Sequence, residues 1–299
     1  MQTSSASEKP GPELRLDEGF IASKDSLRLY WRSLVPVDPA QARAHVAIVH
    51  GYCEHSGRYR ETMERLARAG FAAHALDYRG HGQSDGRRAH VDDFGEYVAD
   101  LESFLERVGG QAGGRKVFLM GHSLGGLICA RWALGRKGSV AALALVSPFM
   151  GMAFEPPRLK TLFAKLADRV VPWLPVSNGL ALEGLTHDPE IRRATERDPL
   201  YQHTTTPRWF REATRAQREV FERAAELTIP CQVMGGSEDP IADPKAIRRL
   251  YEAIGSEPKV FKPYAGMLHE ILNELDRDRV FADLLAWWDQ QLASDAPSA

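Results

Sequence analysis

The segment from Val117 to Ile128 constrains the fold of this chain most, because it reads as strand, tight turn and helix in direct succession. Its first four apolar residues are too few for a helix and predict a strand. They run into Gly121-His122-Ser123-Leu124-Gly125, after which a helix-compatible apolar pattern begins. In such an elbow the serine backbone is strained, and glycine on both sides relieves crowding against the strand and the helix. The segment predicts a raised Ser123 hydroxyl beside a helix N-terminus, where free N–H groups favour negative charge.

Strand-like and helix-like segments alternate over most of the chain, which predicts an α/β fold with a mostly parallel, doubly wound sheet and helices on both faces. The expected strands are residues 19–23, 26–31, 44–50, 71–76, 117–120, 141–146, 231–235 and 259–264. Apolar residues at helical spacing predict helices over 60–69, 94–108, 244–254 and 280–292, besides the one after the elbow. The first two strands are expected to form an antiparallel hairpin.

The alternation stops between about residues 149 and 226, a length far above the usual connection between strand and helix. An amphipathic helix pattern and two Asp-Pro pairs, Asp188-Pro189 and Asp198-Pro199, suggest a mostly helical insertion. We therefore predict a helical cap at 150–226 between two parts of a core, 13–149 and 227–299. Residues 1–12 are Ser, Glu, Pro and Gly-rich and predict a short disordered leader.

The charges nearly balance, with 38 Lys and Arg against 40 Asp and Glu, so no nucleic-acid partner is expected. No apolar run approaches the ~18 residues that span a bilayer, and the N-terminus does not resemble a secretory signal. Three widely spaced cysteines, Cys53, Cys129 and Cys231, favour neither a disulfide framework nor a zinc site. They suit a reducing compartment, so a cytoplasmic location is predicted.

A serine hydroxyl needs a base, and the base needs an orienting acid. On a sheet of this type the acid and then the histidine follow the nucleophile along the chain. Of the three histidines after Ser123, His187 and His203 fall within the insertion. His269 instead follows a strand, on a loop at the carboxyl edge of the sheet where ligands bind, and is the expected base.

Asp239 is the expected acid, because its loop follows the strand that ends at residue 235 and opens on the same edge. Asp243 is the rival, but it directly precedes Pro244 and resembles a helix N-cap. Glu238 is a weaker third candidate. For the oxyanion of acyl transfer, the backbone N–H of Leu124 is one expected donor. The N–H of Tyr52, in the turn that Gly51 permits after the strand ending at His50, is the other.

Four blocks of the chain together resemble α/β-hydrolases of the monoglyceride lipase and lysophospholipase group. They are residues 50–59, Asp77-Tyr78-Arg79-Gly80-His81-Gly82-Gln83-Ser84-Asp85-Gly86, residues 121–126 and residues 264–275. The resemblance implies Ser123, Asp239 and His269 as the triad, as the residues themselves suggest, and a helical cap after the sixth strand.

The resemblance also implies that Glu54 and Arg58 lie near the glycerol end of the substrate, although a structural ion pair is an equal alternative. The chain departs from the family at Tyr52, where members often have a small residue. It departs again at Leu272, where animal monoglyceride lipases carry a histidine.

Trp173 and Leu174, in an apolar stretch studded with prolines, are further candidates for substrate binding. They could face lipid or an acyl chain, or they could pack on the core. An apolar rim on the cap could touch a membrane or micelle surface peripherally.

We therefore expect a serine hydrolase that cleaves carboxylic esters of lipid-like substrates, as a monoacylglycerol lipase or a lysophospholipase-type esterase. The alternatives are a general carboxylesterase or thioesterase that acts on shorter acyl groups and, more remotely, a non-catalytic ligand sensor on the same fold. No metal and no organic cofactor is expected. The expected partner is a small lipid ester, and the sequence predicts no oligomeric state.

Overall fold

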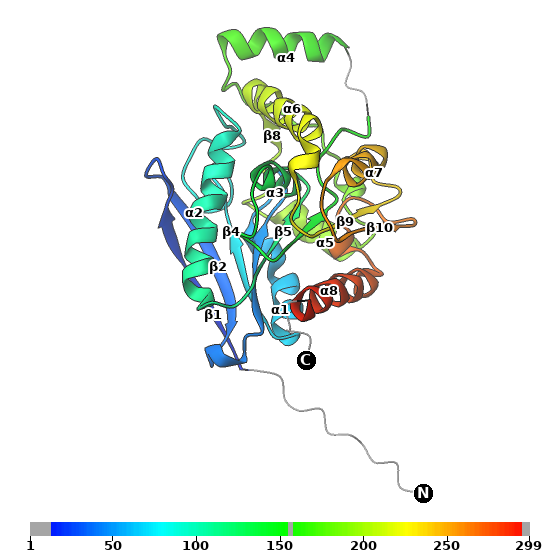
Figure 1. Ribbon diagram of the computed structural model, residues 1–299. Coiled ribbons are helices and arrows are strands. Elements are labelled where there is room, and N and C mark those ends of the chain that lie inside the picture. Colours follow the sequence, from blue (N-terminus) through cyan, green and yellow to red (C-terminus); the bar gives the residue numbers. More distant parts are fainter. Residues whose placement is uncertain (1–12, 155–157, 295–299) are drawn as a thin grey trace, which may run out of the picture.

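A mostly parallel sheet with helices on both faces forms the centre of the structure, a computed structural model that describes residues 13–154 and 158–294 (Figure 1). The leader predicted at residues 1–12 lies outside the described residues. The strands of this sheet are β1 (Leu14–Ala22), β2 (Arg28–Pro36), β3 (Ala44–Val49), β4 (Phe71–Leu76), β5 (Val117–His122), β6 (Ala142–Val146), β9 (Cys231–Gly236) and β10 (Lys259–Tyr264).

The strand order across the sheet is β1-β2-β4-β3-β5-β6-β9-β10, and every neighbouring pair from β4 to β10 is parallel. The α-helices are α1 (Arg60–Arg68), α2 (Gly95–Ala112), α3 (Leu124–Ala133), α4 (Arg158–Val170), α5 (Pro189–Arg197), α6 (Pro207–Glu222), α7 (Pro244–Ala253) and α8 (Arg277–Ala293). The predicted α/β class and mostly parallel sheet are confirmed.

The central strands are continuous apolar runs because both of their faces are covered. In β3 all six residues are buried, and alternate residues belong to two different cores. Ala47 and Val49 pack into the core beneath α2, α3, α6 and α7. Val46 and Ile48 pack into the core beneath α1 and α8 on the other face.

The N-terminal hairpin was predicted correctly in kind but too short. β1 and β2 pair antiparallel from Leu14 opposite Pro36 to Ala22 opposite Arg28. β1 is an edge strand of the sheet, and much of its surface is exposed. Charged side chains such as Arg15 and Asp17 therefore occupy strand positions, and they obscured the apolar alternation that sequence reasoning follows.

The segment between β6 and β9 lies over the carboxyl edge of the sheet and contains α4, α5 and α6 (Figure 1). It also contains two short antiparallel strands that the sequence did not suggest, β7 (Val176–Ser177) and β8 (Thr204–Thr205). Asp188 caps α5 and Pro189 is its first residue, as expected of an Asp-Pro helix start. The division of the chain into a two-part core and a cap remains a prediction.

Four loops meet at the carboxyl edge of the sheet, because parallel strands all end there. They follow β3, β5, β9 and β10 and carry Tyr52, Ser123, Asp239 and His269.

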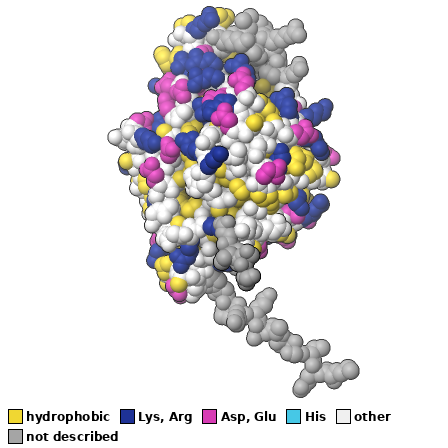
Figure 2. All heavy atoms as spheres, in the orientation of Figure 1, with side chains coloured by type: hydrophobic (Ala, Val, Ile, Leu, Met, Phe, Trp, Pro, Cys, Tyr) yellow, Lys and Arg dark blue, Asp and Glu magenta, His cyan; other side chains and the backbone are white. Residues whose placement is uncertain are grey.

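Basic and acidic side chains are interspersed over the face shown in Figure 2, in keeping with the near-zero net charge. Among the described residues, no helix is both long and apolar enough to cross a membrane.

Candidate active site

The turn between β5 and α3 has the strained geometry that its sequence predicts. Ser123 has φ 51° and ψ −116°, a conformation that non-glycine residues rarely adopt. A Cβ on Gly121 would lie 2.4 Å from the carbonyl oxygen of Gly125. A Cβ on Gly125 would lie 2.2 Å from the carbonyl oxygen of Val49 in the neighbouring strand. Both glycines are therefore required by close backbone approach.

Ser123, His269 and Asp239 form a continuous hydrogen-bonded chain. The Ser123 Oγ lies 2.8 Å from His269 Nε2, and His269 Nδ1 lies 2.7 Å from Asp239 Oδ2. The carboxylate can only accept, so the imidazole proton sits on Nδ1 and Nε2 is free to accept the serine proton. All three residues are at most 5% exposed. This is the geometry of a nucleophile, its base and an orienting acid.

The environment of His269 favours its charged form. Burial alone would lower its pKa, but the negative charge of Asp239 and the hydrogen bond to it outweigh burial and raise the pKa above 6.5. A positive charge on this imidazole is therefore stabilised by the Asp239 carboxylate.

Asp239 and Asp243, the two candidate acids, have different partners. The second oxygen of Asp239 accepts from the N–H groups of Ile241 and Ala242, at 2.8 and 2.9 Å, so the carboxylate is held toward His269. Asp243 instead caps α7 by accepting from the N–H of Lys245, at 2.9 Å, as its position before Pro244 predicted.

The loop after β3, which carries the predicted oxyanion donor Tyr52, lies against Ser123. A Cβ on Gly51 would lie 3.2 Å from the Ser123 Cβ, so the loop backbone directly borders the serine. Gly51 and Tyr52 line the same cavity as Ser123 and His269. Leu124, the other expected donor, is the first residue of α3, where the backbone N–H has no intrahelical partner.

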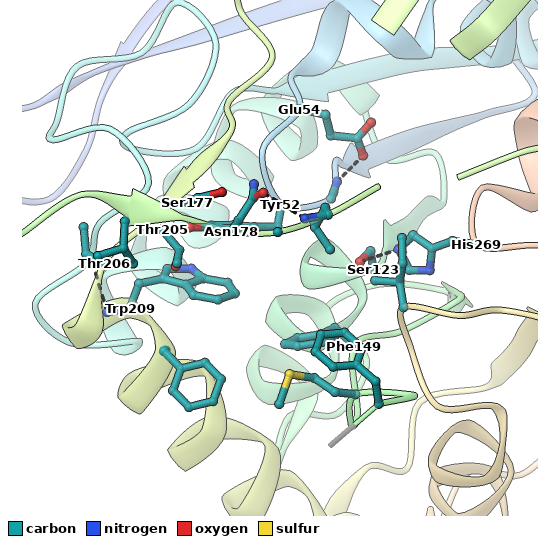
Figure 3. Close-up of a pocket in the computed structure, with 18 of the residues that line it drawn as sticks. Tyr52, Glu54, Ser123, Phe149, Ser177, Asn178, Thr205, Thr206, Trp209 and His269 are labelled. Carbon is teal, nitrogen blue, oxygen red and sulfur yellow. Dashed lines mark hydrogen bonds between the residues drawn. The ribbon is translucent and has the colours of Figure 1, made fainter. Parts of the chain in front are cut away.

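A large cavity of about 930 Å³ opens beside Ser123 and is lined mostly by apolar side chains. Figure 3 shows Ser123 and His269 at one side of it, with Thr205, Thr206 and Trp209 at the opposite side. Its apolar walls include Phe149, Met152, Phe154, Phe163, Trp209 and Phe210. A cavity of this volume and lining can hold an apolar group beside the serine.

The Tyr52 side chain joins the loop after β3 to the segment between β6 and β9. Its ring stacks on Trp209 of α6 with ring centroids 3.8 Å apart, and its hydroxyl donates to the carbonyl of Thr204 in β8 at 3.2 Å. The tyrosine therefore fills space in the cavity wall that a small residue would leave open.

The neighbouring Cys53 is fully buried, and burial raises the pKa of its thiol. Its Sγ accepts a hydrogen bond from the side chain of Asn178, at 3.1 Å. A buried, protonated thiol is inert toward thiol reagents.

Glu54 and Arg58 form the ion pair that sequence reasoning held as the alternative to a substrate contact. Arg58 lies 3.0 Å from Glu54 and 2.8 Å from Glu270, and the three side chains are at most 8% exposed. The Glu54 carboxylate also accepts from three other groups, the Gly51 N–H, the Tyr59 hydroxyl and His122 Nδ1. Burial opposes ionisation of Glu54, but His122 and Arg58 hold its pKa well below 4.5. Glu54 and Glu270 line the cavity, whereas Arg58 is not among the described residues that line it.

Trp173 and Leu174 are not among the described residues that line the cavity. They are 49% and 38% exposed, so they do not pack in the core either. The Arg87 guanidinium lies over the Trp173 ring, 5.9 Å from its centroid. Of the two orientations that the sequence left open, packing on the core is not what the structure shows. Their contact with lipid or an acyl chain remains a prediction.

Sequence reasoning missed several residues at the cavity, including Trp209, Phe149, His122 and Glu270. Glu270 carried a signal, since it directly follows the expected base and is the second carboxylate that could meet Arg58. For Trp209 and Phe149 the sequence carried no signal. An apolar side chain on an amphipathic helix or loop predicts burial but does not identify the residues it packs against.

A sheet of this topology, with a strained serine elbow after β5 and an aspartate and a histidine on later loops, is that of an α/β-hydrolase. The family described as serine aminopeptidase, S33, matches residues 40–276, and the chain belongs to it. The predicted resemblance to the monoglyceride lipase group is confirmed.

Three similar proteins indicate where in this family the chain lies. A monoacylglycerol lipase of Mycolicibacterium smegmatis is 31% identical over 90% of this chain and 96% of its own length. The phospholipase YtpA of Bacillus subtilis is 27% identical over 88% of this chain and 99% of its own length. The crystal structure of a monoacylglycerol lipase from Paleococcus ferrophilus is 28% identical, with a TM-score of 0.76 over 93% of this chain and 99% of that one.

Proposed function

We propose that this ester hydrolase cleaves single-chain lipid esters, monoacylglycerols or lysophospholipids, through a covalent acyl-enzyme on Ser123. The observation that carries the proposal is the hydrogen-bonded chain from Ser123 through His269 to Asp239 at the wall of an apolar cavity of about 930 Å³. The names of two similar proteins, a monoacylglycerol lipase and a phospholipase, support the choice of substrate.

In the proposed reaction, Ser123 Oγ attacks the ester carbonyl while His269 Nε2 takes its proton. The backbone N–H groups of Tyr52 and Leu124 stabilise the oxyanion, and a donor of this kind typically contributes about 10²–10³ in rate. The proton on Nε2 then passes to the leaving alcohol oxygen as the ester bond breaks. Water, deprotonated by His269, hydrolyses the acyl-enzyme and releases the fatty acid.

The substrate is an ester with an apolar chain, because the cavity walls are mainly aromatic and aliphatic. Each methylene transferred into such a cavity contributes ~0.8 kcal/mol, or about fourfold in kcat/KM where it is fully buried. We therefore expect kcat/KM on soluble esters to rise steadily with acyl length until the chain fills the cavity. A preference for the shortest esters would instead favour the general carboxylesterase reading.

An aminopeptidase reading is disfavoured by the charges at the cavity. A substrate ammonium group needs an unpaired carboxylate, and Glu54 and Glu270 both lie at the wall. However, both already contact Arg58, and Glu54 has three further donors. These carboxylates are therefore already paired within the protein, and neither is left unpaired to bind a substrate ammonium group.

We further propose that the exposed apolar residues around α4 contact a membrane or micelle surface. Leu166 and Val170 on α4 are 54% and 74% exposed, and Trp173 follows them with the same outward orientation. Phe163 is 58% exposed and also lines the cavity, so the apolar surface is continuous with the pocket. A substrate chain could pass from an aggregate to the cavity along this surface without crossing water.

The three cysteines are free and buried, which fits the proposed cytoplasmic location.

The test is labelling by a fluorophosphonate followed by turnover of a substrate panel. The panel contains monoacylglycerols, lysophospholipids, acyl-thioesters and aminoacyl anilides. We expect stoichiometric labelling of Ser123, steady turnover of the single-chain lipid esters, and losses approaching 10⁶-fold in kcat for Ser123→Ala and for His269→Ala. Labelling without turnover would indicate a ligand sensor. Turnover of aminoacyl anilides above the esters would contradict the proposal.

A further inference from the structure

The carbonyl of the peptide bond between Gly51 and Tyr52 contacts two buried donors, neither of which is among the described residues that line the cavity. Its carbonyl oxygen, on Gly51, accepts a hydrogen bond from the Tyr78 hydroxyl at 2.7 Å. The same oxygen lies 2.7 Å from His50 Nδ1. Because a carbonyl oxygen can only accept, His50 carries its proton on Nδ1 and donates it there. Both lone pairs of this carbonyl are therefore engaged.

The two donors are fixed in position and in protonation. Tyr78 and His50 are each 1% exposed, and their rings stack with centroids 4.1 Å apart. Burial raises the pKa of Tyr78 well above 10, so the phenol keeps its proton. Burial likewise lowers the pKa of His50, so the imidazole stays neutral. In the described part of the chain His50 Nε2 has no hydrogen-bond partner, as fits an unprotonated nitrogen.

We infer that Tyr78 is a positioning residue of the oxyanion hole, acting through the carbonyl of Gly51 on the N–H of Tyr52. The inference rests on the proposed function, in which this N–H stabilises the oxyanion. A peptide unit is planar, so fixing its carbonyl fixes the direction of its N–H. A hydrogen bond accepted by the carbonyl also polarises the unit and strengthens the N–H as a donor, by about 10–30% for each bond.

The other end of Gly51 is restrained as well, which makes the orientation specific. Its N–H donates to the buried carboxylate of Glu54, and a Cβ on Gly51 would lie 2.7 Å from that carboxylate. The loop is thus clamped on both sides of the glycine before any substrate binds. Preorganisation of this kind is what lets a donor stabilise a transition state without reorganising during the reaction.

The competing explanation is that Tyr78 only satisfies a buried carbonyl, as most buried backbone groups require. That role affects stability and leaves catalysis per folded molecule unchanged. The inference instead predicts weaker stabilisation of the transition state, with binding of the ground-state substrate unchanged. The two explanations therefore differ in kcat and in the affinity for transition-state analogues.

The test compares Tyr78→Phe with Tyr97→Phe. Tyr97 is fully buried and edge-to-face with Tyr78 at 5.0 Å, and in the described residues its hydroxyl has no hydrogen-bond partner. Both variants remove one buried phenol oxygen and keep the ring. The readouts are kcat and KM on a soluble p-nitrophenyl ester, and affinities for a trifluoromethyl ketone and for an unreactive alcohol of the same chain length.

We expect Tyr78→Phe to lower kcat about tenfold, less than the 10²–10³ lost when a donor is removed outright. Affinity for the trifluoromethyl ketone should fall by the same factor, with KM and alcohol affinity unchanged. Tyr97→Phe should stay within about twofold of the parent in every readout. The inference would be overturned by an unchanged kcat in Tyr78→Phe or by a change in KM alone. It would also be overturned if kcat fell equally in both variants.

A second measurement keeps the inference testable if Tyr78→Phe does not fold. Replacing Tyr78 with 3,5-difluorotyrosine retains the hydrogen bond and makes the phenol a stronger donor. We expect kcat and trifluoromethyl ketone affinity to rise together, whereas lower values of both would contradict the inference. Ser123→Ala distinguishes failure of the proposed function from failure of the inference about Tyr78. If it retains turnover the proposed function fails, and if it is inactive while the Tyr78 variants behave like the parent, only the inference fails.

Discussion

At the scale of single residues, two aspartates four positions apart illustrate how environment rather than residue type assigns a role. Asp239 contacts His269 and Asp243 caps α7. We expect Asp239→Asn to lower kcat by about 10⁴, because the amide keeps the shape of the carboxylate but favours the wrong imidazole tautomer. Asp243→Ala should instead lower the free energy of unfolding by about 1 kcal/mol, through loss of the cap. Steady-state kinetics and urea unfolding of both variants check this, and interchanged results would identify Asp243 as the acid.

The raised pKa of His269 predicts that activity falls on the acidic side. The imidazole must be neutral to accept the serine proton, so activity is lost as the pH falls through the pKa of this group. Since Asp239 raises that pKa above 6.5, the acidic limb of kcat/KM should lie above pH 6.5. In Asp239→Asn the anion is gone, so the residual activity should show an acidic limb at lower pH. A pH profile of both proteins measures this shift, and a limb that stays in place would show that another group controls it.

At the scale of elements, α4 combines an exposed apolar surface with a position beside the cavity. Leu166→Ser should leave the melting temperature and the turnover of soluble short-chain esters unchanged, because this side chain is 54% exposed and does not line the cavity. Activity on long-chain monoacylglycerol in micelles should fall several-fold, because less apolar surface meets the aggregate.

Leu275→Ser is the matched control for Leu166→Ser. Leu275 is 67% exposed and lies before α8, outside the segment between β6 and β9. Loss of an exposed leucine there should alter neither activity. Equal losses of micellar activity in both variants would mean that general surface hydrophobicity, and not α4, promotes adsorption.

At the scale of the whole molecule, Arg79 connects three parts of the chain. It follows β4 and pairs with Asp100 of α2 at 2.7 Å, with Glu96 of α2 at 2.8 Å and with Asp25 of the β1–β2 turn at 2.9 Å. Asp100 is fully buried, so Asp100→Ala leaves part of a buried charge uncompensated. We expect the free energy of unfolding to fall by about 3 kcal/mol, with kcat per folded molecule unchanged. Urea unfolding measures it.

The comparison for Asp100→Ala is Asp85→Ala, which breaks an ion pair with Arg28 at the surface. Exposed pairs are screened by water and salt, so this variant should scarcely change stability. If the two variants lose similar stability, the buried pair does not connect these elements in the way proposed.

The sequence by itself determined the features that depend on local chemistry. The glycines around Ser123 specify the elbow because no Cβ fits between β5, α3 and β3. Continuous apolar runs specify the central strands because both faces of the sheet are covered. Chain order and strand ends placed Asp239 and His269 on the loops that the structure brings together.

Only the tertiary structure decided which distant residues meet. The stacking of Tyr52 on Trp209 and the contact of Tyr78 with Gly51 join segments whose separation in sequence gives no pairing signal. The outward orientation of Trp173 was equally undetermined, since an apolar residue in a proline-rich stretch suits a core or an exposed rim. The physical reason is that burial is a property of the assembled surfaces, whereas periodicity and turn chemistry report only what each segment can do locally.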